Sequence, residues 1–581
     1  MVNHGRSAGC LTCKQRRVKC DEAKPACRAC KRLALCCQGY AKPAYAKQRY
    51  ARLQFKDQTH KFVGAGASQD HHIHRPTDTH FQNQNTVIGP SGPNASVNAD
   101  AHDNTAVMFY LHHYANVGRD MASSRGFFEM LIPVYFAQSR GSALSLAVSA
   151  LASAVYSMWS HDPTSFRTLA GSYSRAITRL RTATQDPVEC AEPATILAVL
   201  VLQTYENASA VFGLRRASSI HHDGAASLLP CLDTDHADLT MRAYLRRFML
   251  HTEVSTAIRQ NKPLAPAAYS WLGSKDMADV PENYSSALDA IGVSVAELQS
   301  RYTHFIVQGT GSVCSGHFLD EWKTDAQSVD VRLLMWAKSV PIHWRPSQLV
   351  SVRDFDSSIP SFRSRCDVYP SCQVASIWNL WRFHRILLIK MTLDLIDAFS
   401  AQRCFVPAGQ NGTSQQSYLV DRRAILQKMV DSVCYSVPFY LGNRTKRSSL
   451  TDFTDASILL AVESPCKNGT LHDRYRLGVA DSRDDYRRHI IAQGPWRAMH
   501  PLSSLLTLFS GDSGEVVTGS LRPGQRDWIR IQLSRVATLL HLPPRSHGCT
   551  EKSEPLDGRK AAGAEFLARD LRKGAIFMSG P

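Results

Sequence analysis

This 581-residue sequence lacks three signals, which are typical of nucleotide-binding enzymes, of β-sheet proteins and of secreted proteins. It has no glycine-rich loop of the phosphate-binding type. No segment keeps the alternation of apolar and polar residues typical of half-buried strands for long. The amino-terminal stretch MVNHGRSAGC lacks the apolar core of a secretory signal. We therefore expect an intracellular protein with few strands.

Cysteine is scarce over most of the chain but abundant at its beginning, where seven of the 16 cysteines lie within the first forty residues. The spacing C-x2-C-x6-C occurs twice, in the units CLTCKQRRVKC and CRACKRLALCC, which DEAKPA joins. Cys36 does not fit this repeat, and we interpret it as an unligated thiol rather than a competing ligand. The six cysteines that fit are the candidate metal ligands, namely Cys10, Cys13, Cys20, Cys27, Cys30 and Cys37.

Six clustered cysteines in an intracellular protein favour a metal site over disulfides. Zn²⁺ takes four ligands in a tetrahedron, so the six hold either one ion, with two cysteines left over, or two ions that share ligands. Two tetrahedra need eight ligand places, which six thiolates fill if two of them bridge. Because Cys10 and Cys27 are equivalent under the repeat, we expect them to be the bridges. Such a cluster has a net charge of −2, which nearby Lys and Arg offset.

The segment GCLTCKQRRVKCDEAKPACRACKRLALCCQGY resembles the DNA-binding domain of the fungal binuclear zinc-cluster transcription factors. The six cysteine spacings match, as do the basic run between the second and third cysteines and the proline before the fourth. The resemblance implies two zinc ions per chain and a short helix in each unit, the first of which lies in the major groove of double-stranded DNA at a CGG-type triplet. Carried over by position, it implies base contacts from Arg16 and Arg17, with Lys14 and Lys19 near phosphates.

The charge of the amino-terminal tenth of the chain independently indicates a polyanionic partner. Residues 1–62 hold fifteen Lys and Arg against three Asp and Glu, which is +12 of the total formal charge of +17. Each phosphate that a basic residue neutralises releases condensed counterions, so a concentration of this kind is typical of nucleic-acid binding. The alternative is that these residues only solubilise a small metal module.

The composition changes twice after the cysteine repeat. A basic stretch is followed by a segment rich in Gly, Ser, Asn, Gln, His and Asp, which predicts a flexible linker. Apolar residues then recur at intervals of three and four, as in ALSLAVSALASAVYSMW, which predicts helices. We predict five parts: a zinc-cluster module at 1–40 with two short helices, a basic linker at 41–62, a flexible linker at 63–105, a large all-α domain at 106–545, and a tail at 546–581.

The helical region contains no clear membrane span, because ALSLAVSALASAVYSMW is interrupted by serines and is short for one, so we predict a buried helix and no membrane partner. A second predicted helix, at 377–399, places His384 on its apolar face. We interpret His384 as a packed core histidine rather than a ligand. Arg382 and Arg385 lie off that apolar face.

Several stretches of the helical region resemble the regulatory domain that often accompanies the zinc cluster. They include FFEMLIPVYFAQSRGSALSLAVSALAS, LAVLVLQTYEN, HHDGAASLL and SIWNLWRFHRILL. The resemblance implies an all-helical domain for regulation and dimerisation, without established catalysis. One catalytic-looking match, GDSGE at 511–515, resembles the nucleophile loop of trypsin-like serine proteases. No barrel-like strand pattern precedes Ser513, so we interpret the match as a helix-ending turn and expect no enzyme.

Two functions remain open. The first is a nuclear, sequence-specific regulator of transcription that reads a short GC-rich site, with the transcription machinery or co-regulators as partners and a homodimer as a further expectation. The second is a helical interaction or cofactor protein whose zinc module docks a protein or non-specific nucleic acid. The forked donors of Arg16 and Arg17 favour the first function, because the second has no need of them at these positions.

Overall fold

The chain divides into two compact units, Met1–His74 and Arg75–Pro581, which are described separately. The computed structural model describes residues 10, 12–13, 18, 20–21, 23, 27–33, 37, 104–116, 123, 125–160, 165–214, 216, 218–232, 239–272, 283–308, 316–351, 353–402, 412–462, 483–509, 521–543 and 556–573. The predicted linkers at 41–62 and 63–105 lie outside the described residues, apart from residues 104 and 105, which are helical.

The amino-terminal unit is organised around cysteine side chains. Its described helix, α2 (Arg28–Arg32), begins after Cys27, whose side chain accepts a hydrogen bond from the Cys30 amide. Of the first predicted helix, residues 12 and 13 are helical, and residues 14–17 lie outside the described part of the chain. Cys10, Cys13, Cys27 and Cys30 form the buried cluster of this unit.

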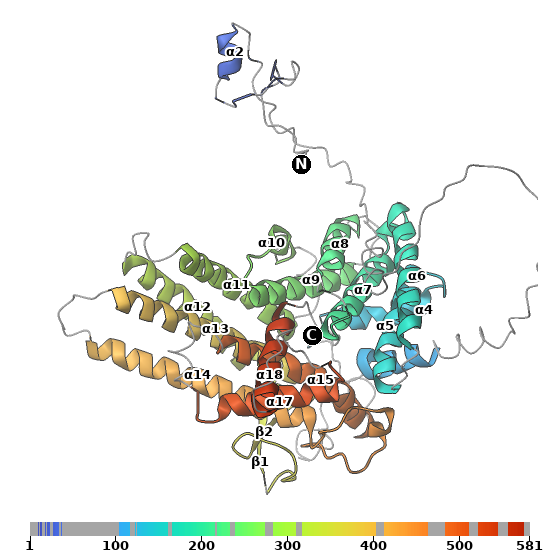
Figure 1. The fold of residues 1–581 in the computed structure, drawn as a ribbon, viewed down its shortest axis with the longest axis vertical. Helices are drawn as coiled ribbons and strands as arrows, with labels where there is room; N and C mark the ends of the chain where they lie inside the picture. The colour runs from blue at the N-terminus through green and yellow to red at the C-terminus, as the bar shows by residue number, and fades with distance from the viewer. Residues whose placement is uncertain are drawn as a thin grey trace, which may run out of the picture. The chain divides into compact units, whose positions relative to one another are not determined.

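The second unit is largely helical, as predicted. Figure 1 shows α11, α12, α13 and α14 as long helices lying alongside one another, with α4 to α7 gathered at the other end of the unit. The α-helices are α4 (Phe127–Ala137), α5 (Ala143–Ser160), α6 (Ser165–Gln185), α7 (Pro193–Val211), α8 (Ile220–Leu228), α9 (Leu239–Gln260), α10 (Pro266–Leu272), α11 (Tyr284–Gln308), α12 (Gly316–Ser339), α13 (Cys372–Gln402), α14 (Gly412–Leu441), α15 (Arg483–Leu508), α17 (Gln525–Leu539) and α18 (Leu556–Lys573). Shorter turns of helix are η2 (Leu111–Asn116, a π-helix) and the 3₁₀ turns η3 (Glu189–Ala191), η4 (Leu229–Leu232), η6 (Ile342–Trp344) and η7 (Leu450–Phe453).

Two helices, α5 and α7, are long and apolar enough to cross a membrane by length and composition. In the structure, 67% of the most apolar window of α5 and 89% of that of α7 are buried. The helix predicted from ALSLAVSALASAVYSMW is therefore confirmed as a buried helix, and α5 packs against α6 and α7.

Two features depart from the predicted architecture. A two-stranded antiparallel sheet joins β1 (Ser347–Val350) and β2 (Arg365–Val368), with Ser347 opposite Val368. Its four-residue strands are too short to show a lasting alternation in the sequence. The region predicted as a tail contains α18, which packs against α15, α17 and α9.

The long helix α13 is buried on more than one side, which changes the roles of its arginines. The sequence placed Arg382 and Arg385 off the apolar face, but only 3% and 5% of these residues are exposed. Arg385 donates to both carboxylate oxygens of Asp330, at 2.6 and 3.2 Å. Arg382 donates to Asp367 of β2 at 3.2 Å. Charged side chains inside a protein need such partners, and these partners lie too far away in sequence for helical periodicity to reveal them.

Helices α14 and α15 approach each other closely at Gly494. A Cβ atom placed on Gly494 would lie 1.9 Å from the carbonyl oxygen of Tyr440. The next residue, Pro495, has no amide hydrogen, so the carbonyl of Ile491 receives no helical bond from it. Arg444 donates to that carbonyl at 2.8 Å. A glycine followed by a proline thus fixes where α15 crosses its neighbour.

We expect Gly494→Ala to destabilise the helical unit, because the added methyl group collides with backbone rather than with a flexible side chain. Overpacking of this kind costs about 1–3 kcal/mol. The matched control is Gly171→Ala on α6, where an added Cβ meets nothing within 4 Å. That change should stabilise the unit by about 0.5–1 kcal/mol. Urea unfolding midpoints of the two variants measure the difference, and equal midpoints would contradict the close approach.

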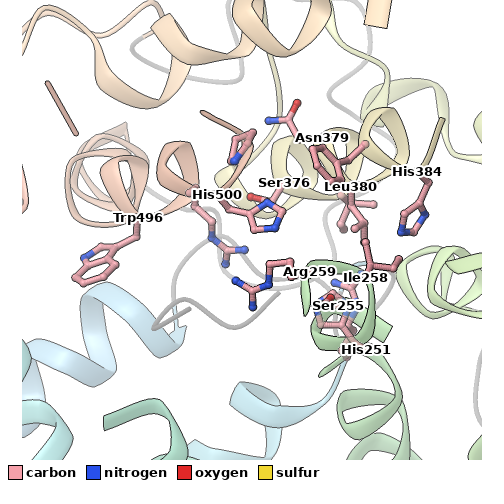
Figure 2. A pocket seen from close by; sticks show the side chains of 15 residues that line it. His251, Ser255, Ile258, Arg259, Ser376, Asn379, Leu380, His384, Trp496 and His500 are labelled. Atoms are coloured by element: carbon pink, nitrogen blue, oxygen red, sulfur yellow. Dashed lines mark hydrogen bonds between the residues drawn. The ribbon is translucent and has the colours of Figure 1, made fainter. Parts of the chain in front are cut away.

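Three helices of this unit, α9, α13 and α15, surround a cavity (Figure 2). Each presents one face to it, because the lining residues recur at helical spacing, for example 251, 255 and 258 on α9 and 376, 380 and 383 on α13.

Candidate metal centre and nucleic-acid interface

The two sequence repeats form the same local structure at their first cysteines. The Cys13 amide donates to the sulfur of Cys10 at 3.3 Å, and the Cys30 amide donates to the sulfur of Cys27 at 3.3 Å. In each cysteine repeat, therefore, the amide of the second cysteine donates to the sulfur of the first. Both first cysteines are fully buried. The equivalence of Cys10 and Cys27 in the sequence is also an equivalence of local geometry.

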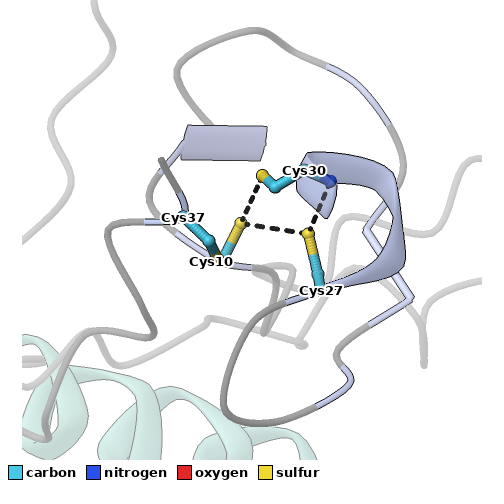
Figure 3. Close-up of side chains that lie close together, drawn as sticks. All are labelled: Cys10, Cys27, Cys30 and Cys37. Atoms are coloured by element: carbon cyan, nitrogen blue, oxygen red, sulfur yellow. Dashed lines mark hydrogen bonds between the residues drawn. The ribbon is translucent and has the colours of Figure 1, made fainter. Parts of the chain in front are cut away.

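The cysteine sulfurs form two groups of four that have two members in common. One group is Cys10, Cys13, Cys20 and Cys27, and the other is Cys10, Cys27, Cys30 and Cys37. Within each group the sulfurs all lie within 4.8 Å of one another. Figure 3 shows the second group, in which the sulfurs of Cys10, Cys27 and Cys30 face one another and Cys37 lies beside Cys10. The structure thus brings together all six cysteines that fit the repeat.

The distances between sulfurs suit a metal tetrahedron. Cys10 lies 3.7 Å from Cys27 and 3.8 Å from Cys30, and Cys13 lies 3.6 Å from Cys27. A tetrahedron with Zn–S bonds of about 2.3 Å has sulfur–sulfur edges of about 3.8 Å. Disulfide sulfurs are about 2.05 Å apart. The observed spacing matches the first arrangement, so the residues present fit zinc.

Electrostatics also indicate that this cluster suits a cation. Burial raises the pKa of Cys13, and the neighbouring thiols of Cys10, Cys27 and Cys30 raise it further. Thiolates crowded in this way repel one another, whereas a bound Zn²⁺ stabilises the deprotonated form. The cysteines could therefore hold zinc ions as thiolates.

Asp21, which follows the first cysteine repeat, contacts the second repeat. The sequence did not predict this contact. The two carboxylate oxygens of Asp21 accept hydrogen bonds from the Arg28 amide at 3.0 and 3.2 Å. A carboxylate at the start of α2 satisfies an amide that has no partner within the helix. Asp21 lies seven positions before Arg28, so no local capping pattern reveals this contact.

The residues predicted to contact DNA, Lys14, Arg16, Arg17 and Lys19, lie outside the described residues, as does Cys36. Their neighbours Cys13 and Cys20 are described, and both belong to the first sulfur group. The serine-protease-like stretch 511–515 is likewise outside the described residues, and α15 ends before it at Leu508.

Comparison with known proteins identifies this segment. Residues 8–47 match the fungal Zn(2)-Cys(6) binuclear cluster domain. A domain of this kind binds two zinc ions, which confirms the predicted cofactor.

Several relatives match short stretches of the chain. The transcriptional regulatory protein pro1 of Neurospora crassa is 50% identical over 56 residues, covering 10% of this chain and 8% of the relative. The sterol uptake control protein 2 of Saccharomyces cerevisiae is 67% identical over 30 residues, covering 5% of this chain and 3% of the relative. The pestheic acid cluster transcriptional regulator 3 of Pestalotiopsis fici is 54% identical over 41 residues, covering 7% of each chain. The similarity thus spans less than a tenth of each relative, and no solved structure matches the chain significantly.

The spare cysteine provides a direct test of the ligand set. We expect Cys37→Ser to lower the zinc content of the chain, because the Cys37 sulfur lies in the second group. Cys36→Ser, the matched control one residue away, should leave the zinc content unchanged, because Cys36 does not fit the repeat. Native mass spectrometry counts the ions. A loss of zinc in Cys36→Ser with full retention in Cys37→Ser would mean that Cys36 is the ligand.

Proposed function

We propose that the protein is a nuclear, DNA-binding regulator of transcription that reads a short GC-rich site, of the CGG type, through a zinc cluster. The observation that carries this proposal is the pair of four-sulfur groups sharing Cys10 and Cys27, within the segment that matches the binuclear cluster domain. Relatives named as transcriptional regulators match the chain over 56 and 41 residues. The excess of +12 in residues 1–62 supplies attraction to DNA.

The proposal assigns one zinc ion to each sulfur group. Cys10, Cys13, Cys20 and Cys27 hold the first ion, and Cys10, Cys27, Cys30 and Cys37 hold the second, so that Cys10 and Cys27 bridge. The ions supply the folding free energy of a segment too small for a large apolar core. The chain's own contribution is the placement of the sulfurs through the two cysteine turns and the Asp21 contact.

Metal binding also positions the basic segment. Lys14, Arg16, Arg17 and Lys19 all lie between Cys13 and Cys20, whose sulfurs belong to the same group. If both cysteines bind one ion, the two ends of this segment are held together. The segment then loses less conformational entropy when it binds DNA. We assign base contacts to Arg16 and Arg17, because a guanidinium can donate two hydrogen bonds to guanine. We assign phosphate contacts to Lys14 and Lys19.

The helical unit completes the proposal. We assign it a regulatory role, with the transcription machinery or co-regulators as partners and a second copy of the chain in a homodimer. This assignment rests on the resemblance of its helices α4, α5, α7, α8 and α13 to a regulatory domain. No enzyme activity is part of the proposed function.

Base readout distinguishes this function from docking to a protein or to non-specific nucleic acid. A selection on random duplexes with the zinc-loaded chain should enrich a GC-rich triplet. Arg17→Ala should then reduce the preference for that triplet by about 1–3 kcal/mol. Lys14→Ala is the matched control, because loss of a phosphate contact should weaken binding to all sequences alike. It should also make the slope of log binding constant against log salt concentration shallower by about one.

Two outcomes would count against the assignment. If no triplet is enriched, the cluster does not read sequence, and the docking function is favoured instead. If both substitutions reduce specific and random binding equally, Arg17 is not a base contact. Affinities must be compared at one fixed salt concentration, because the electrostatic part of binding changes with salt.

A further inference from the structure

The cavity between α9, α13 and α15 lies in the helical unit and plays no part in the proposed DNA contact. The cavity has a volume of about 110 Å³. Its lining residues include His251 and Ser255 from α9, Leu380 and His384 from α13, and Trp496 from α15. Figure 2 shows the side chains of α9 opposite those of α13, with the α15 residues beside them. Three helices distant in sequence, together with Arg125 just before α4, therefore build one site.

The walls of the cavity are rich in basic groups. Three arginines line it, Arg125, Arg259 and Arg497, and no Asp or Glu is among the lining residues that the structure describes. Arg125 is balanced behind the wall by Asp289, to which it donates at 2.5 and 3.1 Å. His251 also bonds to Asp289, at 2.7 Å. That carboxylate is therefore already engaged twice.

The other two arginines bring further positive charge to the wall. Arg497 is 6% exposed and donates to the neutral amide oxygens of Gln373 at 2.8 Å and Gln493 at 3.3 Å. Arg259 is 7% exposed. Burial lowers the pKa of Arg259 to about 10, so its guanidinium stays charged at neutral pH. A buried cation is costly to desolvate, and an anion placed beside it offsets part of that cost.

His384 supplies a second, independent sign of a ligand. It is fully buried on the cavity wall, and neither of its ring nitrogens has a hydrogen-bond partner among the described residues. Burial lowers its pKa to about 4, so the ring is neutral at physiological pH and offers one donor and one acceptor. Buried polar groups almost always have partners. A polar group of a bound molecule would satisfy this imidazole.

Apolar side chains complete the wall. Ile258, Ile377, Leu380 and Phe383 line the same cavity. A mostly apolar site with a few convergent polar groups is typical of a pocket for a small organic molecule. An inorganic ion alone would leave these apolar surfaces without contacts.

We propose that this cavity binds a small organic carboxylate with an apolar body. The carboxylate lies against Arg259 and Arg497, the apolar body packs on Ile377 and Leu380, and a neutral polar group of the ligand bonds to His384. Because the site joins three helices from distant parts of the chain, the ligand stabilises the folded helical unit by mass action. This inference concerns the helical unit alone and does not rest on DNA binding.

The test uses the full-length, zinc-loaded chain. The probes are butanoate, hexanoate, octanoate and phenylacetate, each compared with its uncharged amide, and inorganic phosphate. At least one carboxylate should raise the unfolding temperature and bind, by calorimetry, about tenfold or more tightly than its amide and than phosphate. If no carboxylate in this series binds better than its amide, or if phosphate binds as tightly as the best carboxylate, the proposal is overturned.

Variants locate the site. Arg259→Gln should weaken binding of the best carboxylate about tenfold or more. Arg332→Gln is the matched control and should bind normally, because Arg332 is exposed on α12 and donates to Ser294. If Arg259→Gln does not fold, Ser255→Phe serves instead, since it fills the cavity and keeps every arginine. Wild-type affinity in whichever of these two variants retains its helical circular dichroism would overturn the proposal.

Discussion

The amino-terminal unit depends on the clustering of cysteine sulfurs that could hold zinc ions. Among its described residues, the fully buried side chains are those of Cys10, Cys13, Cys27 and Cys30. Within the described part of this unit, cysteine side chains rather than larger apolar ones form the buried cluster. Burial, and next to it the neighbouring thiols, raise the pKa of the Cys13 thiol, so the arrangement favours metal ligation over free thiolates. The proposed DNA contact follows from this constraint, because the same sulfurs fix the two ends of the basic segment.

The helical unit is stabilised differently. It has a continuous apolar core of its own, which contains none of the six repeat cysteines. Several of its buried charges lie in specific pairs, such as Arg385 with Asp330 and Arg125 with Asp289. The described wall of the cavity between α9, α13 and α15 holds three arginines and no carboxylate. The proposed carboxylate would bind in this basic cavity and stabilise the folded helical unit.

The sequence predicts those features that depend on neighbouring residues. The doubled spacing gives the two sulfur groups, since a repeat places equivalent residues in equivalent turns, and apolar periodicity gives α5, α7 and α13. Contacts between distant segments are not visible in it. Asp21 bonds to an amide seven residues away, and the partners of Arg382 and Arg385 come from β2 and α12. The basic cavity likewise appears only when three helices pack together.

The central claim is that Cys10 and Cys27 bridge two zinc ions, and zinc X-ray absorption on the chain loaded with two ions per molecule tests it most directly. If Cys10 and Cys27 bridge, each zinc has four sulfur neighbours although the repeat supplies only six cysteines. Bridging also predicts zinc–zinc scattering at less than twice the Zn–S bond length of about 2.3 Å. Nitrogen or oxygen in place of a sulfur neighbour, without zinc–zinc scattering, would contradict it and indicate two separate sites.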